Sequence, residues 1–426
     1  MDTIVLIMLL IYVLIILISI LGLTSLSVAA LIGAVLTAWF GIQYGVFDYE
    51  GALGFVDFQL LALLIGTMIV VEVAKRGGLF NVFALYAIKI SGGHPGRLFV
   101  SICVVSALVS MFLSDPTAML LVAAATVTIT KLLNYDPTPY FLSAAIMINL
   151  GGTSTLIGSV SNMIIGLEAE ITFLEFLSFL GIGEIMLWGL TILTLYFIFR
   201  SRLGTRKELP EYDPMEGVKD PKIFSRSIVI LTLLVILFIS VDLIGVGPEA
   251  VALGCGILAL LVSRVDPAEI FRELDWETVF FIAGFMFIVG GLEQTQFLGD
   301  ISTQLFQFAG GSSFIATQLI LWVSGVASAF VSNIAIALTF TPIVSAQALS
   351  GLNIDAIWSG LILGTNLGGA TTPFSGAVMM MAVGTLKREK IEIHFSDFVK
   401  VGVITTLIQL CFSSIYLVFR FGLIGT

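Results

Sequence analysis

Long, uninterrupted runs of apolar residues recur along the whole chain. The runs 4–21 and 228–239, for example, are broken only by a tyrosine, a serine or a threonine. An α-helix crosses the roughly 30 Å hydrocarbon core of a bilayer with about 20 such residues. The strands of a transmembrane β-barrel are about 10 residues long and alternate in polarity, which these runs do not. The pattern therefore predicts an all-α polytopic membrane protein.

The polar interruptions between the runs occur twice in the same order. Four short segments of the first half have counterparts in the second, at offsets of 218, 218, 217 and 222 residues: 56–59 with 274–277, 112–115 with 330–333, 149–152 with 366–369, and 173–176 with 395–398. Self-similarity of this kind indicates repeated structural units. We expect two repeats that cover nearly the whole chain, joined by a basic, proline-containing linker over residues 200–226.

Each repeat is predicted to hold five spanning helices and one hydrophobic hairpin, over residues 97–133 and 313–349. The hairpins break at polar tips, Ser114-Asp115-Pro116 and Ser332-Asn333, and their arms are short, so we interpret them as re-entrant. Five crossings is an odd number. The second repeat must therefore be inverted relative to the first.

The distribution of basic residues agrees with this inversion. If the N-terminus lies outside, 18 of the 19 Lys and Arg residues fall on the cytoplasmic side and only Arg420 falls outside. The acidic loops 48–50 and 168–170 also fall outside. Cytoplasmic loops carry an excess of Lys and Arg. The expected location is therefore the plasma (inner) membrane, with an external N-terminus.

Composition excludes several classes of protein. The chain is 58% hydrophobic and 11% charged, with a mean hydropathy of +1.09, which does not fit a soluble domain or a nucleic-acid-binding protein. No nucleotide-binding or zinc motif is present, so we expect no cofactor and no direct use of ATP. The three cysteines lie far apart in apolar segments, where packing is the simplest role.

The two hairpin tips are the first candidate site. Ser114, Asp115 and Thr117 form one tip, and Ser332 and Asn333 form the other. Broken helices near the bilayer midplane hold substrates in inverted-repeat transporters, because freed backbone groups and helix ends face a cavity there. Hydroxyl and amide oxygens suit an alkali cation or an oxyanion, and helix N-termini favour an anion.

A second candidate site follows each glycine pair, where the chain can unwind and approach a ligand closely. After Gly151-Gly152 and Gly368-Gly369 come the residues that we predict to bind substrate with the hairpin tips, namely Thr153, Ser154, Thr155, Thr371, Thr372 and Ser375. The alternative is that Ser and Thr bond to their own backbone or to a neighbouring helix, as they commonly do inside membranes.

Asp115 is the ionisable side chain that the sequence places deepest. Buried ionisable groups in membranes are functional by default, so we assign it to a coupling proton or sodium ion, with amides and a hydroxyl nearby: Asn149, Ser161, Asn162, Asn333 and Asn366. A sodium ion would lie at Asp115 and Asn333. The alternative for Asp115 is a plain helix N-cap, the role we expect for Asp57 and Asp275.

These motifs resemble the ion transporter superfamily, which includes arsenite permeases, sodium–proton antiporters and citrate transporters. The hairpin tips resemble the paired tips of that family, and Asn149–Asn162 resembles its Gly-Gly-x-x-Thr-x-Ile-Gly-x-x-x-Asn signature. The stretch that follows Asn366 is the counterpart, but it has Met379 where the family often has Asn. The resemblance covers nearly the whole chain.

The resemblance implies a homodimer that works by an elevator mechanism. Scaffold helices would occupy residues 1–54 and 227–272. The moving transport parts would occupy 55–199, with a broken helix at 139–168, and 273–426, with a broken helix at 355–385.

The function we expect is secondary transport of a small anion, coupled to protons or sodium. The substrate would be a metalloid oxyacid such as arsenite, or a di- or tricarboxylate. The alternative is sodium–proton exchange without an organic substrate. An intramembrane enzyme would require a catalytic pair of acids or a metal site, neither of which the sequence contains. A passive channel would not need two broken-helix sites.

Overall fold

The computed structural model describes residues 2–21, 23–113, 115–207, 213–241, 245–347, 351–372, 375, 377–388 and 395–423. All regular secondary structure in these ranges is helical, which confirms the predicted all-α class. The first half contains α1 (Thr3–Leu21), α2 (Leu26–Gln43), α3 (Tyr49–Leu53), α4 (Phe58–Gly77), α5 (Leu79–Ser91), α6 (Pro95–Ser110), α7 (Asp115–Leu132), α8 (Pro137–Thr153), α9 (Val160–Glu168) and α10 (Phe173–Phe199).

The second half follows a short 3-10 helix, η1 (Pro214–Gly217). It contains α11 (Pro221–Ile239), α13 (Pro248–Ser263), α14 (Pro267–Glu273), α15 (Trp276–Gln294), α16 (Phe297–Phe308), α17 (Ser313–Ser328), α18 (Asn333–Ser345), α19 (Ile354–Gly368), α20 (Ala377–Arg388) and α21 (Phe395–Phe421). α11 begins five residues before the predicted end of the linker, because Asp220 caps its first turn and Pro221 occupies the first helical position.

Seven helical segments in the described ranges are long and apolar enough to cross a membrane: 3–21, 26–43, 49–77, 173–199, 221–239, 276–294 and 396–421. Shorter apolar helices lie between them, including both arms of each predicted hairpin. The 16-residue helix α13 is also among these shorter helices. The chain is therefore a multi-pass membrane protein.

The helix breaks occur where the sequence predicts them. Each hairpin is a pair of helices, α6 with α7 and α17 with α18, and each pair is interrupted near its polar tip. The segments 139–168 and 355–385 are likewise divided, into α8 and α9 and into α19 and α20. Asp57 and Asp275 cap α4 and α15 by accepting backbone N–H groups, as expected.

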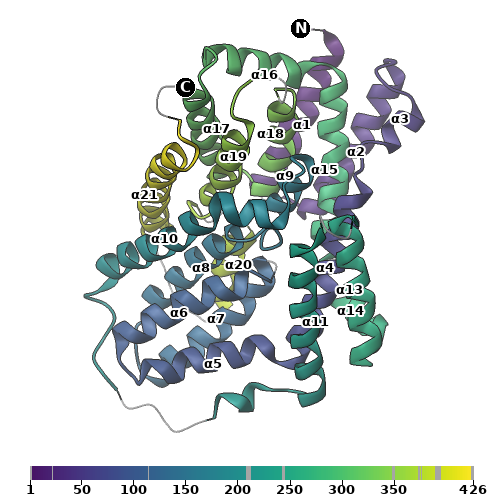
Figure 1. Cartoon of the computed structure of the whole chain (residues 1–426). Helices are drawn as coiled ribbons and strands as arrows, with labels where there is room; N and C mark the ends of the chain where they lie inside the picture. Colours follow the sequence, from purple (N-terminus) through teal and green to yellow (C-terminus); the bar gives the residue numbers. More distant parts are fainter. Residues whose placement is uncertain are drawn as a thin grey trace.

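Close packing between the two halves forms one side of the molecule. α4 packs along α13 and α11, and α15 packs along α2 and α1 (Figure 1). Glycines allow these contacts, since Gly66 lies against the backbone of Ala252 and Gly284 lies against that of Ala30. Two further groups of helices, α5–α8 and α16–α19, lie at opposite ends of the view, with α10 crossing between them (Figure 1).

Candidate functional site

A cavity lies between the side formed by α1, α4 and α15 and the helix breaks of both halves. It contains about 1500 Å³ of empty space, counted out to its open mouth. One wall is apolar and includes Ile16, Leu64, Met68, Phe281 and Phe285. The opposite wall is formed by the two hairpin tips and by the start of α9.

On the wall formed by the helix breaks, five small polar residues line the cavity: Thr117, Asn149, Ser159, Ser332 and Asn333. Four of them were predicted as substrate or coupling-ion residues, and Ser159 is the addition. They come from α7, α8, α18 and the segment before α9, so the fold brings residues from both halves to one space. The predictions for Ser114 and for the side chain of Asp115 lie outside the described residues.

Two of the helix N-termini that reach the cavity have no side-chain cap. Ser159 is the N-cap of α9 and Ser332 is the N-cap of α18, and neither side chain makes a capping hydrogen bond. The first N–H groups of a helix have no partner within the helix and carry its positive partial charge. Such ends attract anions. Each half of the chain therefore contributes one electropositive helix end to the cavity wall.

A buried network of amides connects the two broken helices behind the cavity. Asn149 Nδ2 donates to the Asn366 carbonyl at 2.8 Å, and Ser161 Oγ donates to Asn366 Oδ1 at 2.8 Å. Asn366 Nδ2 donates to Asn162 Oδ1 at 2.8 Å and to the carbonyl of Ile362 at 2.7 Å. Four of the predicted coupling-ion residues are thus in contact with one another.

The side chains after the glycine pairs hold the breaks open. Thr155 Oγ1 donates to the carbonyl of Met111 at 2.7 Å, and Thr372 Oγ1 donates to that of Ala329 at 2.8 Å. These carbonyls lie at the ends of the first hairpin arms. The broken helix of each half is therefore fastened to the hairpin of the same half.

Carbonyls freed at the breaks also accept side-chain hydrogen bonds. Asn162 Nδ2 donates to the carbonyls of Gly152 at 3.0 Å and Thr155 at 2.7 Å. Ser375 Oγ makes the equivalent bonds in the second half, to Gly369 at 2.8 Å and Thr372 at 2.7 Å. Ser375 supplies these bonds where the sequence lacks the second Asn of the family signature.

The other predicted substrate residues also bond to protein groups. Thr153 Oγ1 donates to the carbonyl of Asn149 at 3.2 Å, and Thr371 Oγ1 donates to Thr406 Oγ1 at 3.1 Å. Ser154 Oγ contacts Glu184 on α10. Within the described residues, the hairpin tips and Asn149 line the cavity, whereas Thr153, Ser154 and Thr371 brace the helices around it.

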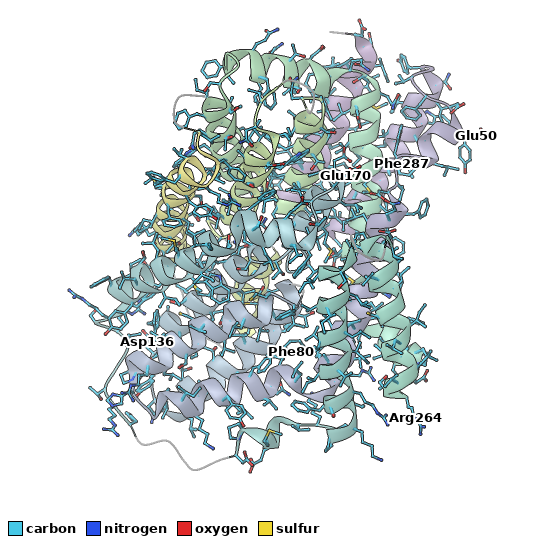
Figure 2. All side chains as sticks on the ribbon, in the orientation of Figure 1. Glu50, Phe80, Asp136, Glu170, Arg264 and Phe287 are labelled. Atoms are coloured by element: carbon cyan, nitrogen blue, oxygen red, sulfur yellow. The ribbon has the colours of Figure 1, made fainter. Side chains whose placement is uncertain are left out.

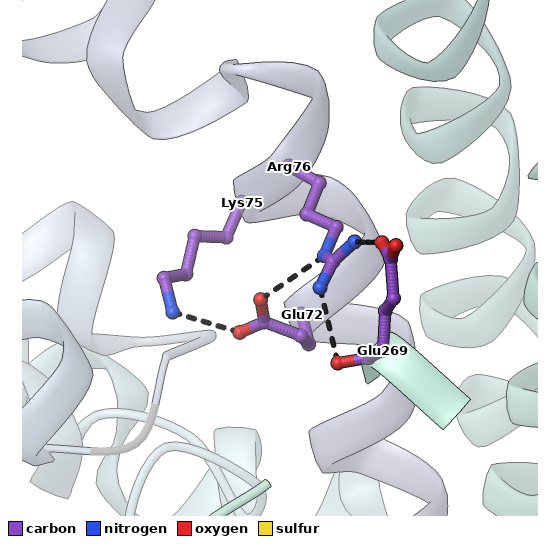
Figure 3. Close-up of polar contacts among 4 residues, drawn as sticks. All are labelled: Glu72, Lys75, Arg76 and Glu269. Carbon is purple, nitrogen blue, oxygen red and sulfur yellow. Dashed lines mark hydrogen bonds and ion pairs between the residues drawn. The ribbon is translucent and has the colours of Figure 1, made fainter. Parts of the chain in front are cut away.

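Four carboxylates also line the cavity: Glu72, Glu273, Asp275 and Glu277. Glu72 is only 6% exposed and contacts two cations of its own helix, with Lys75 Nζ at 2.8 Å and Arg76 Nε at 3.6 Å (Figure 3). Arg76 also contacts Glu269 on α14 through a 2.6 Å ion pair. Basic residues three and four positions after an acid on a helix predict such ion pairs, so the spacing of Lys75 and Arg76 from Glu72 is a sequence signal for this contact.

Replacing Arg76 with alanine is expected to destabilise the protein by about 0.5–1.5 kcal/mol, because the buried Glu72 loses its second cation and keeps Lys75. The effect should come mainly through Glu72, because the pair with the exposed Glu269 contributes little. Thermal unfolding in detergent measures it. Arg272→Ala, which removes a basic side chain outside this network, is the control, and equal melting temperatures for the two variants would contradict the prediction.

A second cavity lies between α4 and α15 on one side and α9 and α18 on the other. Asp57, Glu168 and Glu293 line it, and Ser345 Oγ donates to Glu168 Oε1 at 2.8 Å. Asp57 and Asp275 occupy equivalent positions at the starts of α4 and α15, and each lies in a different cavity. Both cavities thus have acidic walls.

The chain is similar to known transporters over most of its length. The sequence profile of a citrate transporter family matches residues 12–364. An uncharacterized transporter of Mycobacterium tuberculosis is 29% identical, covering 86% of this chain and 87% of the relative. The magnetosome protein MamN of Magnetospirillum gryphiswaldense is 25% identical, covering 82% and 80%. The P protein of Homo sapiens is 23% identical, covering 84% of this chain and 53% of the relative.

A solved structure shares the fold. The crystal structure of the YdaH transporter of Alcanivorax borkumensis superposes with a TM-score of 0.60 at 15% sequence identity, covering 90% of this chain and 89% of that one. At this identity the likeness concerns the fold alone.

Proposed function

The chain belongs to the citrate transporter family, within the ion transporter superfamily, and from this premise we propose that it is an ion-coupled secondary transporter of small anions of the di- or tricarboxylate class. Its coupling ion is a proton or sodium. The observation that carries the proposal is the pair of uncapped helix N-termini, at Ser159 and Ser332, that face one cavity.

This wall can bind an anion without a basic side chain. No Lys, Arg or His is among the described residues that line the cavity. Two helix ends, each with about half a positive charge, supply the attraction. The hydroxyls of Thr117 and Ser332 and the amides of Asn149 and Asn333 supply hydrogen-bond partners. A carboxylate needs such donors, and an arsenite-like oxyacid, the other predicted class, uses the same groups.

The proposal includes two inverted repeats. Matched contacts support it, because Thr155 and Thr372 make the same bond in the two halves, and Gly66 and Gly284 the same close approach. The two hairpin groups lie at opposite ends of the view (Figure 1). Glu50, in a predicted external loop, lies toward the end with the N-terminus, and Arg264, predicted to be cytoplasmic, lies toward the other end (Figure 2).

An elevator movement fits the position of the cavity, which lies between two groups of helices. We place α1, α2, α4, α11, α13 and α15 in the scaffold, because α4 and α15 pack with the first two helices of the opposite half. This division moves the scaffold boundaries from residues 54 and 272 to about 78 and 295. The scaffold would also hold the dimer in the plasma membrane. The hairpins and broken helices would then move against this scaffold with the substrate.

Sodium–proton exchange is the second candidate, and a specific observation favours it. Both cavities are lined by carboxylates, four in the first and three in the second. Acidic walls concentrate cations and repel free anions. An exchanger would need only these acids and the hydroxyls and amides of the hairpin tips.

A thermal-shift screen on the purified protein separates the two candidates. Citrate, succinate, arsenite, phosphate and sulfate would each be tested with and without sodium, at two pH values. A ligand of the folded state at about 100 times its Kd stabilises by about 2.7 kcal/mol. We expect citrate or succinate to raise the melting temperature, and more so with the coupling ion. A shift from sodium alone, indifferent to every anion, would instead support the exchanger.

Asn333→Ala is expected to weaken anion binding by about tenfold or more, since one good hydrogen bond to a charged group contributes about 1.5–3 kcal/mol. Titration of citrate in the thermal-shift assay measures the change. Thr303→Ala, on the exposed side of α16, is the matched control with normal affinity. Equal affinities for both variants would remove Asn333 from the binding site.

A further inference from the structure

A carboxyl group is buried in the middle of α10, apart from the cavity. Glu184 lies about 16 Å along the helix from its first residue, at 1.5 Å per residue. Its side chain is only 2% exposed. Oε2 accepts a hydrogen bond from Ser154 Oγ at 3.2 Å, and Oε1 has no hydrogen-bond partner among the described groups. α10 crosses the centre of the molecule between the two hairpin groups (Figure 1).

Among the described residues, no basic side chain forms an ion pair with this group. The titratable residues on α10 and on the helices packed against it are Glu175 and Tyr196 on α10, Arg97 and Cys103 on α6, Tyr140 on α8, Lys222 and Arg226 on α11, and Asp397, Lys400, Cys411, Tyr416 and Arg420 on α21. The ring of Tyr416 lies against Gly183, while Arg420 donates to the carbonyl of Ser178. None of the ion pairs found in the described part of the chain includes Glu184.

The second half of the chain shows that bracing the helix break does not require a carboxylate. Thr371 and Thr406 occupy the positions equivalent to Ser154 and Glu184, at offsets of 217 and 222 residues. There a hydroxyl donates to a hydroxyl at 3.1 Å. A neutral pair is therefore sufficient at this place in the fold. The carboxyl of Glu184 is an addition to only one half, and it calls for a separate function.

We propose that Glu184 is a proton-binding site that couples transport to pH, at a distance from the substrate cavity. An ionised carboxylate without a cation is costly inside a membrane protein. The protonated acid is neutral and tolerates this environment. Glu184 takes a proton from water in one state of the transport cycle, forming the O–H bond of the acid, and returns it to water in the other. The proposal rests on ion-coupled transport as the proposed function and identifies the ion.

Ser154 connects this proton to the substrate cavity. Trp188 Nε1 donates to Ser154 Oγ at 2.9 Å, and the hydroxyl has a single hydrogen of its own to donate. Two acceptors compete for it at 3.2 Å, the carbonyl of Leu150 and Glu184 Oε2. An ionised carboxylate is the stronger acceptor. Loss of the proton from Glu184 therefore strengthens the hydrogen bond that joins the end of α8 to α10, and uptake of a proton weakens this bond. The segment that follows this end of α8 carries Ser159.

The test uses full-length protein in liposomes with an imposed pH difference. One pH unit is equivalent to about 1.4 kcal/mol, or about a tenfold accumulation of citrate per coupled proton. We expect the wild type to accumulate citrate and Glu184→Gln to accumulate none. In the variant, exchange of labelled for unlabelled citrate should no longer vary with pH. Glu184→Asp, which keeps a titratable group, should retain proton-driven accumulation in part.

Glu175→Gln is the matched control. It removes the same charge from the exposed first turn of α10, and glutamine can still complete the capping box with Thr172. This variant should accumulate citrate like the wild type. Proton-driven accumulation by Glu184→Gln at the wild-type level would overturn the proposal. A loss shared equally by Glu184→Gln and the control would also contradict it.

Infrared spectroscopy tests Glu184 without any substrate. A protonated carboxyl shielded from solvent should give a carbonyl stretching band in the wild type that is missing in Glu184→Gln and present in Glu175→Gln. A wild-type protein without this band at any accessible pH would overturn the proton site. If the band is present but no anion is transported, the proposed anion transport fails while the proton site stands.

Discussion

Asn366→Ala is expected to abolish transport and to lower the melting temperature markedly. The side chain donates to Asn162 and to the carbonyl of Ile362, and it accepts from Ser161, all at 2.7–2.8 Å in a buried site. Interhelical hydrogen bonds in membrane proteins average about 0.6 kcal/mol. A buried polar group left without a partner costs about 1–3 kcal/mol. Because the variant leaves Asn162 Oδ1 without its donor, the second effect dominates.

Transport should fail because Asn366 joins the broken helices of the two halves. Its side chain bonds to Ser161 and Asn162 on α9, so its loss frees α9 and α19 to separate beside the cavity. Circular dichroism during heating and citrate uptake in liposomes measure the two effects. Gln409→Ala is the matched control: Gln409 is an equally buried amide that donates one bond, to Thr191 at 2.9 Å. A variant at Asn366 that is as stable and as active as the control would contradict the central role of this network.

Gly151→Ala is expected to have a comparable effect by a different mechanism. An added methyl group at Gly151 would overlap the backbone of Ala107 on α6. The equivalent Gly368 lies in the same way against Gly325 on α17. Overpacking of a core costs about 1–3 kcal/mol, and more when it meets backbone that cannot rotate away. The first arm of this hairpin, α6, would move away from α8, and the hairpin tip would move with it.

The control for this prediction is Gly189→Ala in α10, where an added methyl group would meet no atom within 4 Å. Alanine in a helix is more stable than glycine by about 0.5–1 kcal/mol, so this variant should be unchanged or slightly more stable. Melting temperature and uptake are again the measurements. If the two alanine variants behave alike, the close contact between α6 and α8 does not limit the fold.

Much of the fold follows from local sequence. Apolar runs specify the long helices because only a helix satisfies its own backbone in lipid. Glycine pairs and the polar tips specify the breaks, and Asp57 and Asp275 specify the starts of α4 and α15. These features depend on a few neighbouring residues. For this reason the helix class and the positions of the breaks could be predicted.

The partners of each helix could not be predicted in this way. A helix that is apolar on all sides does not indicate which neighbour it contacts. That α4 packs with α13 depends on the small side chains at Gly66 and Ala252, which are far apart in sequence. The direction of Ser154 toward Glu184 likewise follows from the tertiary contact between α8 and α10.

The sequence prediction also missed two buried acids. Glu184 interrupts an apolar run and could have been recognised as a deep ionisable residue, like Asp115. Glu72 is followed by Lys75 and Arg76, and only the structure shows that it faces the cavity. The tip residues Ser332 and Asn333, which line the cavity, were predicted because polar groups at a break in an apolar hairpin have few other roles.

Uptake of labelled citrate into liposomes that contain the purified protein is the measurement that tests this account most directly. An inward gradient of protons or of sodium would be imposed and then collapsed with an ionophore. The account predicts accumulation above the external concentration that ends when the gradient is collapsed and that Asn333→Ala weakens. Uptake that never exceeds the external concentration, or that is the same with and without each gradient, would contradict ion-coupled transport of this anion class.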